Sequence, residues 1–219
     1  EFPKLRVKDP YTLRDYQKFA FDDVVKGFEK HDRGKMIMAC GTGKTLVSLH
    51  VAEKTAGKSG CVLFLVPSIS LILQSMRQWS ENANMKHYYI AVCSDKSTGD
   101  EGTITELESP VSTDVNDLKS SIKNRPKDSM TVIFSTYHSI EVVEKAMQGE
   151  SFDIIICDEA HRTTGIEDRS YWTIVHNNKR IHSRKRLYMT ATPRIYHNKI
   201  KAKMGDVLFS MDDENYGPE

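Results

Sequence analysis

The stretch Met38-Ala-Cys-Gly-Thr-Gly-Lys-Thr45 decides the fold class of this chain of 219 residues. The apolar run 35–39 suits a buried strand, and the residues after the stretch follow a helix-compatible pattern as far as Gly57. Gly41 and Gly43 would let the backbone wrap closely round a phosphate, and the following helix would present its positive dipole end to that anion. This order of strand, loop and helix predicts a phosphate-binding loop.

The residues of this loop have distinct expected roles toward a nucleotide. Lys44 would reach the β- and γ-phosphates, and the Thr45 hydroxyl would bind Mg²⁺. We expect Lys44 to face solvent when no nucleotide is bound. The motif usually starts with a glycine, but this chain has Met38 there, so a glycine-rich turn with an exposed lysine is the alternative for the loop alone. The residues expected to bind the cofactor are Cys40, Gly41, Thr42, Gly43, Lys44 and Thr45.

A pair of carboxylates, Asp158 and Glu159, directly follows the strongly apolar run 152–157. That position is the carboxyl end of a predicted buried strand, which is where ligands of open α/β sheets bind. Asp158 would hold Mg²⁺ through water, because this ion keeps much of its hydration shell. Glu159 would polarise an attacking water molecule. The alternative is a turn after the strand with two solvated acids.

Two further motifs, Leu13-Arg-Asp-Tyr-Gln17 and Thr190-Ala-Thr-Pro193, join the loop and the sequence Asp158-Glu-Ala-His161. With these four motifs the chain resembles the first RecA-like motor domain of superfamily 2 helicases and translocases, in the DEAH-box style. The resemblance runs from about Leu13 to about Met211. It implies an α/β, RecA-like P-loop NTPase fold that uses ATP and Mg²⁺.

The same resemblance implies roles for individual residues. Gln17 would contact the nucleobase, and His161 would link the γ-phosphate region to the coupling residues Thr190 and Thr192. The catalytic residues would be Lys44, Glu159 and His161. The loops at 66–70 and 135–137 look like the strand-end loops that hold a nucleic-acid backbone, with contacts at Pro67, Ser68 and Thr136.

Within the superfamily, the motif at Leu13–Gln17 looks like the DNA translocases of restriction enzymes rather than the DEAD-box RNA helicases. The segments 33–45, 65–71 and 210–218 are similar to the helicase part of single-polypeptide, type ISP, restriction–modification enzymes. This resemblance implies an ATP-dependent translocase that contacts the backbone of double-stranded DNA. Half of an RNA helicase and a non-motor nucleotide-binding module are the alternatives. The Asp158–Glu159 pair argues against the last, because a binding module needs no water-polarising carboxylate.

Members of that family need a second RecA-like domain, which supplies arginines to the γ-phosphate. Nothing after Thr192 resembles such a domain. The chain is therefore expected to be one motor half, a single domain spanning 1–219, and a poor ATP hydrolase without its partner domain.

The coarse pattern of the chain alternates strands with helices, which predicts a mostly parallel sheet covered by helices on both faces. An irregular insertion at about 94–129 interrupts this pattern, with one short helix near 113–123 that begins at Thr113. The first helix, 10–31, is expected to bury Tyr16, Phe19, Ala20, Val24 and Phe28. The other expected helices are 44–56, 69–81, 138–147 and 168–177, and the expected strands are 35–39, 61–66, 88–93, 130–135, 153–158, 185–190 and 206–210.

Composition agrees with a compact intracellular domain, since 39% of the residues are hydrophobic and 28% are charged. No apolar run approaches the twenty or so residues of a membrane span, and no signal peptide is visible, so no membrane partner is expected. The cysteines lack CxxC spacing and lie in or beside predicted strands, which favours reduced thiols in a cytoplasmic protein over zinc or disulfide sites. They are Cys40, Cys61, Cys93 and Cys157.

The net charge of +1 does not indicate a nucleic-acid partner by itself. Between Lys179 and Lys203, however, the sequence holds nine lysines and arginines and no acidic residue. Such a run could follow the phosphates of a nucleic acid. A solvated face, or a docking surface for a missing domain, explains it equally well.

Overall fold

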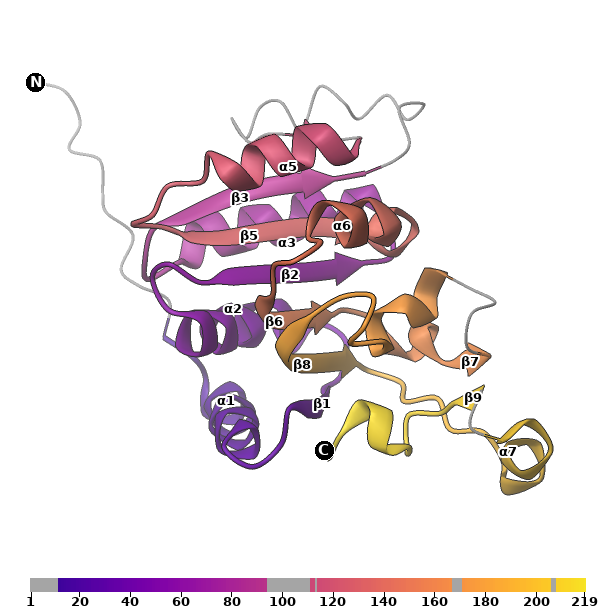
Figure 1. Cartoon of the computed structure of the whole chain (residues 1–219). Helices are drawn as coiled ribbons and strands as arrows, with labels where there is room; N and C mark the ends of the chain where they lie inside the picture. The colour runs from indigo at the N-terminus through magenta and orange to yellow at the C-terminus, as the bar shows by residue number, and fades with distance from the viewer. Residues whose placement is uncertain (1–11, 94–110, 113, 167–170, 206–207) are drawn as a thin grey trace, which may run out of the picture.

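A computed structural model describes residues 12–93, 111–112, 114–166, 171–205 and 208–219. These residues form a seven-stranded sheet in the order β1-β8-β6-β2-β5-β3-β4, in which all neighbouring strands are parallel (Figure 1). This arrangement confirms the predicted α/β class with a RecA-like parallel sheet. The strands are β1 (Arg33–Ile37), β2 (Cys61–Val66), β3 (His87–Val92), β4 (Val111–Ser112), β5 (Met130–Thr136), β6 (Phe152–Cys157) and β8 (Ser183–Thr190).

Helices cover both faces of the sheet, as expected for parallel strands joined by crossovers (Figure 1). One face packs against α1 (Asp15–Phe28), α2 (Lys44–Ala56) and α3 (Ile69–Asn82). The opposite face packs against α5 (Val115–Lys123), α6 (Ile140–Ala146) and the 3-10 helix η3 (Tyr171–His176). Shorter elements complete the described chain: η1 (Tyr137–Ser139), η2 (Ala160–Thr163), α7 (Asn198–Met204) and η5 (Glu214–Tyr216).

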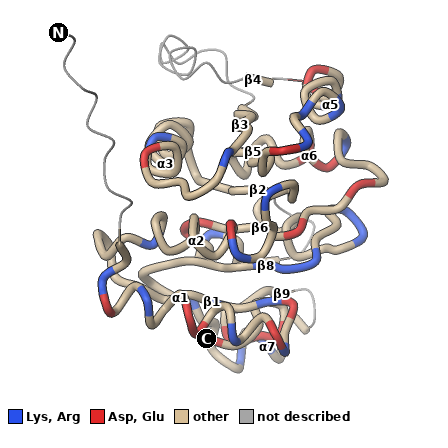
Figure 2. Tube along the Cα trace, turned by 90° about the vertical axis from the view of Figure 1, so that its left-hand side faces the viewer, with Lys and Arg blue, Asp and Glu red and all other residues tan. Residues whose placement is uncertain are grey.

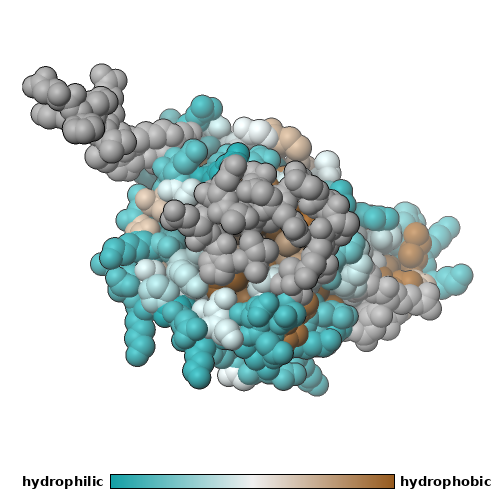
Figure 3. All heavy atoms as spheres, turned by 90° about the horizontal axis from the view of Figure 1, so that it is seen from above, coloured by the Kyte–Doolittle hydropathy of each residue, from teal (hydrophilic) through white to brown (hydrophobic). Residues whose placement is uncertain are grey.

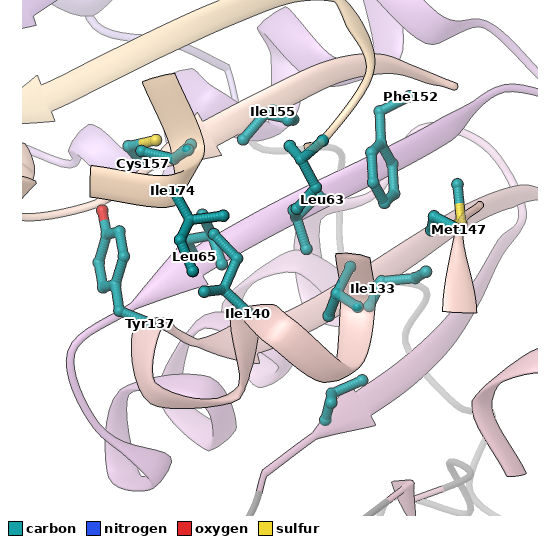
Figure 4. Packing of buried hydrophobic residues seen from close by; sticks show 14 of the residues in the cluster. Leu63, Leu65, Ile133, Tyr137, Ile140, Met147, Phe152, Ile155, Cys157 and Ile174 are labelled. Carbon is teal, nitrogen blue, oxygen red and sulfur yellow. The ribbon is translucent and has the colours of Figure 1, made fainter. Parts of the chain in front are cut away.

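The core consists of two hydrophobic clusters, one on each face of the sheet. Strand β2 contributes to both, because successive side chains of a strand point to opposite faces. Phe64 packs with the cluster under α2 and α3, where its ring lies 5.2 Å from that of Trp79. Leu63 and Leu65 belong to the other cluster, shown in Figure 4. A strand buried on both faces needs apolar side chains at every position, which explains the continuous apolar runs of the sequence.

The surface around α5 is largely hydrophilic when the molecule is seen from above (Figure 3). Within the described ranges, no helix combines the length and the apolar character needed to cross a membrane.

The first helix differs from its prediction in extent and in the face that it buries. It spans Asp15–Phe28, and the predicted start at residue 10 lies outside the described residues. Tyr16 and Phe19, which were expected in the core, are 44% and 71% exposed. The polar Gln17 is buried instead, because its amide is used in contacts with the neighbouring loop.

Three other predicted elements require correction. The short helix near 113–123 begins at Val115, and Thr113, its predicted start, lies outside the described residues. Its N-cap is Asp114, whose carboxylate accepts hydrogen bonds from the N–H groups of Asn116 and Asp117. Of the predicted helix 168–177, residues 171–176 form the 3-10 helix η3, and 168–170 are not described. Of the predicted last strand, 206–210, residues 206–207 lie outside the described part of the chain, and β9 (Leu208–Phe209) pairs antiparallel with β7 (Gly165–Ile166) outside the main sheet.

The C-terminal segment, residues 208–218, is tied to the edge strand β1. The side chains of Arg33 and Lys35 donate hydrogen bonds of 2.8 Å to the carbonyls of Asn215 and Met211. The backbone N–H of Lys35 donates to the carbonyl of Pro218 at 2.7 Å. Gly217, at φ +71, passes so close to β1 that a Cβ there would lie 2.0 Å from the Arg33 carbonyl oxygen. The C-terminal segment is therefore an integral part of the fold.

Candidate nucleotide and nucleic-acid site

The predicted phosphate-binding loop lies at the carboxyl end of β1 and leads directly into α2. Gly41 and Gly43 adopt φ angles of +75 and +90, a region that glycine enters without steric penalty. Gly43 is the N-cap of α2, and it offers no side chain to the first N–H groups of the helix, which have no partner inside it. A 13-residue helix with an open N-terminus, preceded by two left-handed glycines, has the donors that a phosphate group requires.

The prediction that Lys44 faces solvent is wrong. Its side chain is 9% exposed, and Nζ donates hydrogen bonds to the carbonyls of Met38 at 3.1 Å and Ala39 at 3.4 Å. The ammonium group thus satisfies two backbone carbonyls of the loop. To contact a phosphate, Lys44 has to exchange these carbonyls for phosphate oxygens.

Gln17 reaches the same loop from α1. Its Nε2 donates to the Thr42 carbonyl at 2.8 Å, and its Oε1 accepts from the backbone N–H of Arg14 at 3.0 Å. A Cβ at Gly43 would lie 2.3 Å from Gln17 Nε2, so only glycine permits this approach. Nε2 thus joins α1 to the loop and Oε1 caps the start of α1, so both polar ends of the amide are used, and a contact with a nucleobase stays a prediction.

Asp158 and Glu159 follow β6 at the carboxyl edge of the sheet. Burial, together with the neighbouring charge of Glu159, raises the pKa of Asp158 to about 6, while the ammonium group of Lys44 opposes the rise. The loop follows β1 and Asp158 follows β6, and these strands run parallel in one sheet, so both lie at its carboxyl end. Glu159, at φ +49, is the one non-glycine residue with positive φ in the described part of the chain. Its N–H donates to Oδ1 of Asp158 at 3.0 Å.

His161 connects this pair to the end of β8, as the resemblance implied. Its Nδ1 lies 3.3 Å from Oε2 of Glu159 and 3.0 Å from the hydroxyl oxygen of Thr190. Partial burial lowers the pKa of His161, although the charge of Glu159 opposes that shift. The Thr190 hydroxyl also accepts the backbone N–H of Thr192 at 3.1 Å. The structure therefore brings together the four residues predicted for catalysis and coupling at these two strand ends.

The predicted nucleic-acid contacts lie at the ends of β2 and β5. Pro67 and Ser68 are half-buried, and the Ser68 hydroxyl lies 3.1 Å from that of Ser70 at an exposed position. Thr136 is only 5% exposed, and its hydroxyl lies 3.1 Å from the buried hydroxyl of Ser139. Ser68 can thus offer a side chain to a ligand, whereas a contact at Thr136 would have to use the backbone of the turn.

Sequence analysis missed two aromatic residues that support the site. The indole N–H of Trp79 donates to the Thr45 carbonyl at 3.0 Å, which fixes α3 against the first turn of α2. The Tyr137 hydroxyl donates to the Asp158 carbonyl at 2.9 Å. Both side chains are fully buried. From the sequence alone they cannot be distinguished from ordinary aromatic residues of the core. The signal in the sequence was the position of Tyr137 as the last residue of the predicted strand-end loop 135–137.

The basic run of the sequence does not form one continuous surface. Strand β8 runs through the middle of this segment, so the residues before and after it lie at opposite ends of the strands. Basic and acidic residues are interspersed around both ends (Figure 2). At the amino edge, Arg180 binds Glu144, Arg184 binds Asp153 and Lys185 binds Asp32, while Arg186 is buried. At the carboxyl edge, Lys201 binds Asp212 and Asp213. The pairing favours solvated ion pairs for much of the run.

Comparison with known proteins supports the same assignment. Two solved structures of Type ISP restriction-modification enzymes resemble this chain with a TM-score of 0.77 and 37% sequence identity over 95% of its length. One is a nuclease-deletion mutant of LlaGI in complex with a DNA substrate mimic, and the other is the ATP-dependent LlaBIII bound to DNA. The matched region is 19% and 15% of those chains.

Among curated proteins, the probable helicase A859L of African swine fever virus (isolate Pig/Kenya/KEN-50/1950) is 30% identical over 189 residues, which is 84% of this chain and 20% of that protein. The chain therefore spans about a fifth or less of the length of these relatives. A family model described as "Type III restriction enzyme, res subunit" matches residues 10–195. With its RecA-like sheet and its motifs in this order, the chain belongs to that family, as the first motor domain of a superfamily 2 helicase.

Proposed function

We propose that this chain is the ATP-binding half of an ATP-dependent DNA translocase of the kind found in restriction enzymes. One observation carries the proposal. At the carboxyl end of the parallel sheet, the loop with Lys44 follows β1 and the buried Asp158 follows β6, and His161 lies within 3.3 Å of both Glu159 and Thr190. A nucleotide-binding module without a motor needs the loop but not this link between a water-polarising carboxylate and a neighbouring strand end.

The residues present fit ATP and Mg²⁺. The open N-terminus of α2 would hold phosphate groups, Lys44 would neutralise part of their charge, and Cys40, Thr42 and the two glycines would shape the loop around them. The Thr45 hydroxyl and the Asp158 carboxylate are oxygen ligands of the type that Mg²⁺ prefers. When bound, Mg²⁺ stabilises negative charge on the phosphates. Glu159 would orient and polarise the attacking water, with His161 fixing the position of its carboxylate.

Double-stranded DNA is the partner that we propose, contacted through its backbone near Pro67, Ser68 and the turn after Thr136. The DNA-bound Type ISP relatives support this choice. Half of an RNA helicase is the alternative. We also propose that a second RecA-like domain of the same protein completes the active site, so that the 219 residues alone hydrolyse ATP poorly. The thiols of Cys61, Cys93 and Cys157 are buried and form no disulfide, which fits a cytoplasmic protein.

The test uses the full-length protein that contains this chain. ATP turnover is measured without nucleic acid, with duplex DNA and with RNA, for the wild type and for Lys44→Ala. We expect stimulation by duplex DNA, and loss of ATP binding and turnover in Lys44→Ala, because that variant lacks the ammonium group at the phosphates. Lys54→Ala is the matched control, since Lys54 lies in the last turn of the same helix and is exposed.

Three results would count against the proposal. Normal ATP binding by Lys44→Ala would exclude the loop as the phosphate site. Stimulation by RNA but not by duplex DNA would select the RNA helicase. Full DNA-stimulated turnover by the 219 residues alone would contradict the need for a second domain.

A further inference from the structure

Tyr137 joins the turn after β5 to the carboxylate pair. It is the first residue after Thr136, and its side chain is fully buried in the cluster between the sheet and α6. Figure 4 shows its hydroxyl on the side of Cys157, the residue before Asp158. The hydroxyl donates to the Asp158 carbonyl at 2.9 Å, and the ring packs 4.5 Å from that of Trp172. The ring of Tyr137 therefore packs among apolar side chains, and its hydroxyl makes a polar contact with the Asp158 backbone.

The peptide group between Asp158 and Glu159 is held at both of its polar ends. Its carbonyl accepts the Tyr137 hydroxyl, and its N–H donates to Oδ1 of Asp158 at 3.0 Å. Because a peptide is planar, these two bonds fix the orientation of the whole group and of the carboxylate that receives the N–H. The φ angle of Glu159, +49, is sparsely populated by residues other than glycine, so the surrounding contacts must maintain it.

The other end of Tyr137 leads to the turn that the proposed function assigns to nucleic acid. Thr136 is buried, and its hydroxyl is 3.1 Å from that of Ser139, so the turn 136–139 is closed on itself. The exposed residue of this turn is His138, whose ring lies 4.1 Å from that of Tyr171. A ligand that moves this turn as a unit would therefore move Tyr137 with it.

We propose that Tyr137 is a positioning residue that transmits nucleic-acid contact at the end of β5 to the metal-binding carboxylate of Asp158. The proposal rests on the proposed function. The path needs one hydroxyl group, the peptide 158–159 and the hydrogen bond from Glu159 to Asp158. It lies entirely within this domain, and it is separate from the link between His161 and Thr190.

The experiment compares Tyr137→Phe with the wild type in the full-length protein. This change removes the hydroxyl and keeps the ring in the core. We expect DNA-stimulated kcat to fall about tenfold, the scale of one lost hydrogen bond. The Mg²⁺ concentration for half-maximal turnover should rise severalfold, because the carboxylate is less well oriented. The KM for ATP and the Kd for duplex DNA should stay within about twofold, since the Tyr137 side chain is buried and the substitution alters no exposed group.

Tyr188→Phe is the matched control. Tyr188 is also fully buried, and its hydroxyl lies 3.0 Å from Nδ1 of His176 rather than on the Asp158–Glu159 peptide. Both variants should lower the melting temperature by similar amounts, but only Tyr137→Phe should change the Mg²⁺ dependence and the stimulation by DNA. If the two variants have the same kinetics, Tyr137 merely stabilises the fold and the proposal is overturned. If Glu159→Gln turns over ATP normally in the same protein, the proposed function fails as well.

Discussion

Nδ1 of His161 lies 3.0 Å from the hydroxyl oxygen of Thr190. This contact joins the residues after β6 to the end of β8, which are neighbouring strands of the sheet. The same nitrogen is 3.3 Å from Oε2 of Glu159, so one imidazole touches both the proposed water-polarising carboxylate and the Thr190–Thr192 turn. A change at the nucleotide can thus reach the end of β8 through a single side chain.

Breaking this contact should impair ATP turnover and movement on DNA together. We expect His161→Ala and Thr190→Val each to reduce DNA-stimulated turnover and translocation in the full-length protein, with ATP affinity little changed. Because both changes remove the same interaction, the double variant should be no more impaired than the worse single one. Additive losses in that double-mutant cycle would show that the two residues act independently.

Glu159→Gln separates binding from chemistry. The substitution keeps the shape of the side chain and removes the charge that polarises water, so ATP and ADP affinities should change little. Turnover in the full-length protein should fall by about two orders of magnitude or more, the usual scale for loss of acid–base assistance. Glu144→Gln, which loses a carboxylate paired with Arg180 far from the site, is the control. Normal hydrolysis by Glu159→Gln would reduce Glu159 to a turn residue.

Cys40 should report on nucleotide binding. It is exposed within the proposed phosphate-binding loop, whereas the other three cysteines are buried. Burial raises the pKa of the Cys61 and Cys157 thiols to about 12, which suppresses the reactive thiolate. We expect one fast alkylation in the native chain, absent in Cys40→Ser and slowed by ATP with Mg²⁺, as measured by mass spectrometry. Equal labelling rates with and without nucleotide would argue that the loop does not enclose the phosphates.

The buried His176 should make the fold less stable in mild acid. Burial lowers the pKa of His176 from 6.5 to about 3. Its Nδ1 lies 3.0 Å from the Tyr188 hydroxyl oxygen, and its Nε2 lies 3.0 Å from the Thr163 carbonyl oxygen. Below pH 6.5 the imidazole of His176 is therefore protonated in the unfolded chain but not in the folded chain. The free energy of unfolding is unaffected above that pH and falls as the pH drops toward 3. The loss amounts to about 2 kcal/mol between pH 8 and pH 5.

His176→Gln tests that origin. The variant should be less stable than the wild type at pH 8, because it loses the ring contacts, but its unfolding free energy should change less between pH 8 and pH 5. Denaturant titrations at the two pH values give both quantities. Parallel pH profiles for the two proteins would assign the acid sensitivity to other groups.

The strands of the main sheet were predictable, because apolar runs such as 61–66 and 152–157 are typical of strands buried on both faces. This pattern does not depend on which strands lie next to them. The sheet partners of short, weakly patterned segments were not predictable. Strand β7 has only the residues Gly165 and Ile166, and nothing in them indicates that they capture Leu208–Phe209. The pairing of the predicted last strand with β7 therefore could not be predicted, since it depends on contacts distant in sequence.

In the candidate site, residue types were predictable and their contacts were not. The motifs identified Lys44, Asp158 and Glu159, but the hydrogen bonds of Lys44 to loop carbonyls depend on backbone angles that the motif does not state. The buried face of α1 follows from the amide of Gln17 docking on Thr42, a contact that outweighs the apolar pattern of Tyr16 and Phe19.

The C-terminal segment has a practical consequence for how the domain is cut. The match to the family ends at residue 195, yet Met211, Asn215 and Pro218 accept hydrogen bonds from β1. Tyr216 also places its hydroxyl 2.8 Å from that of buried Thr163, just after the DEAH motif. A protein that ends at residue 195 would leave the donors of Arg33 and Lys35 and the hydroxyl of Thr163 without these partners. The smallest unit worth expressing therefore extends at least to Pro218.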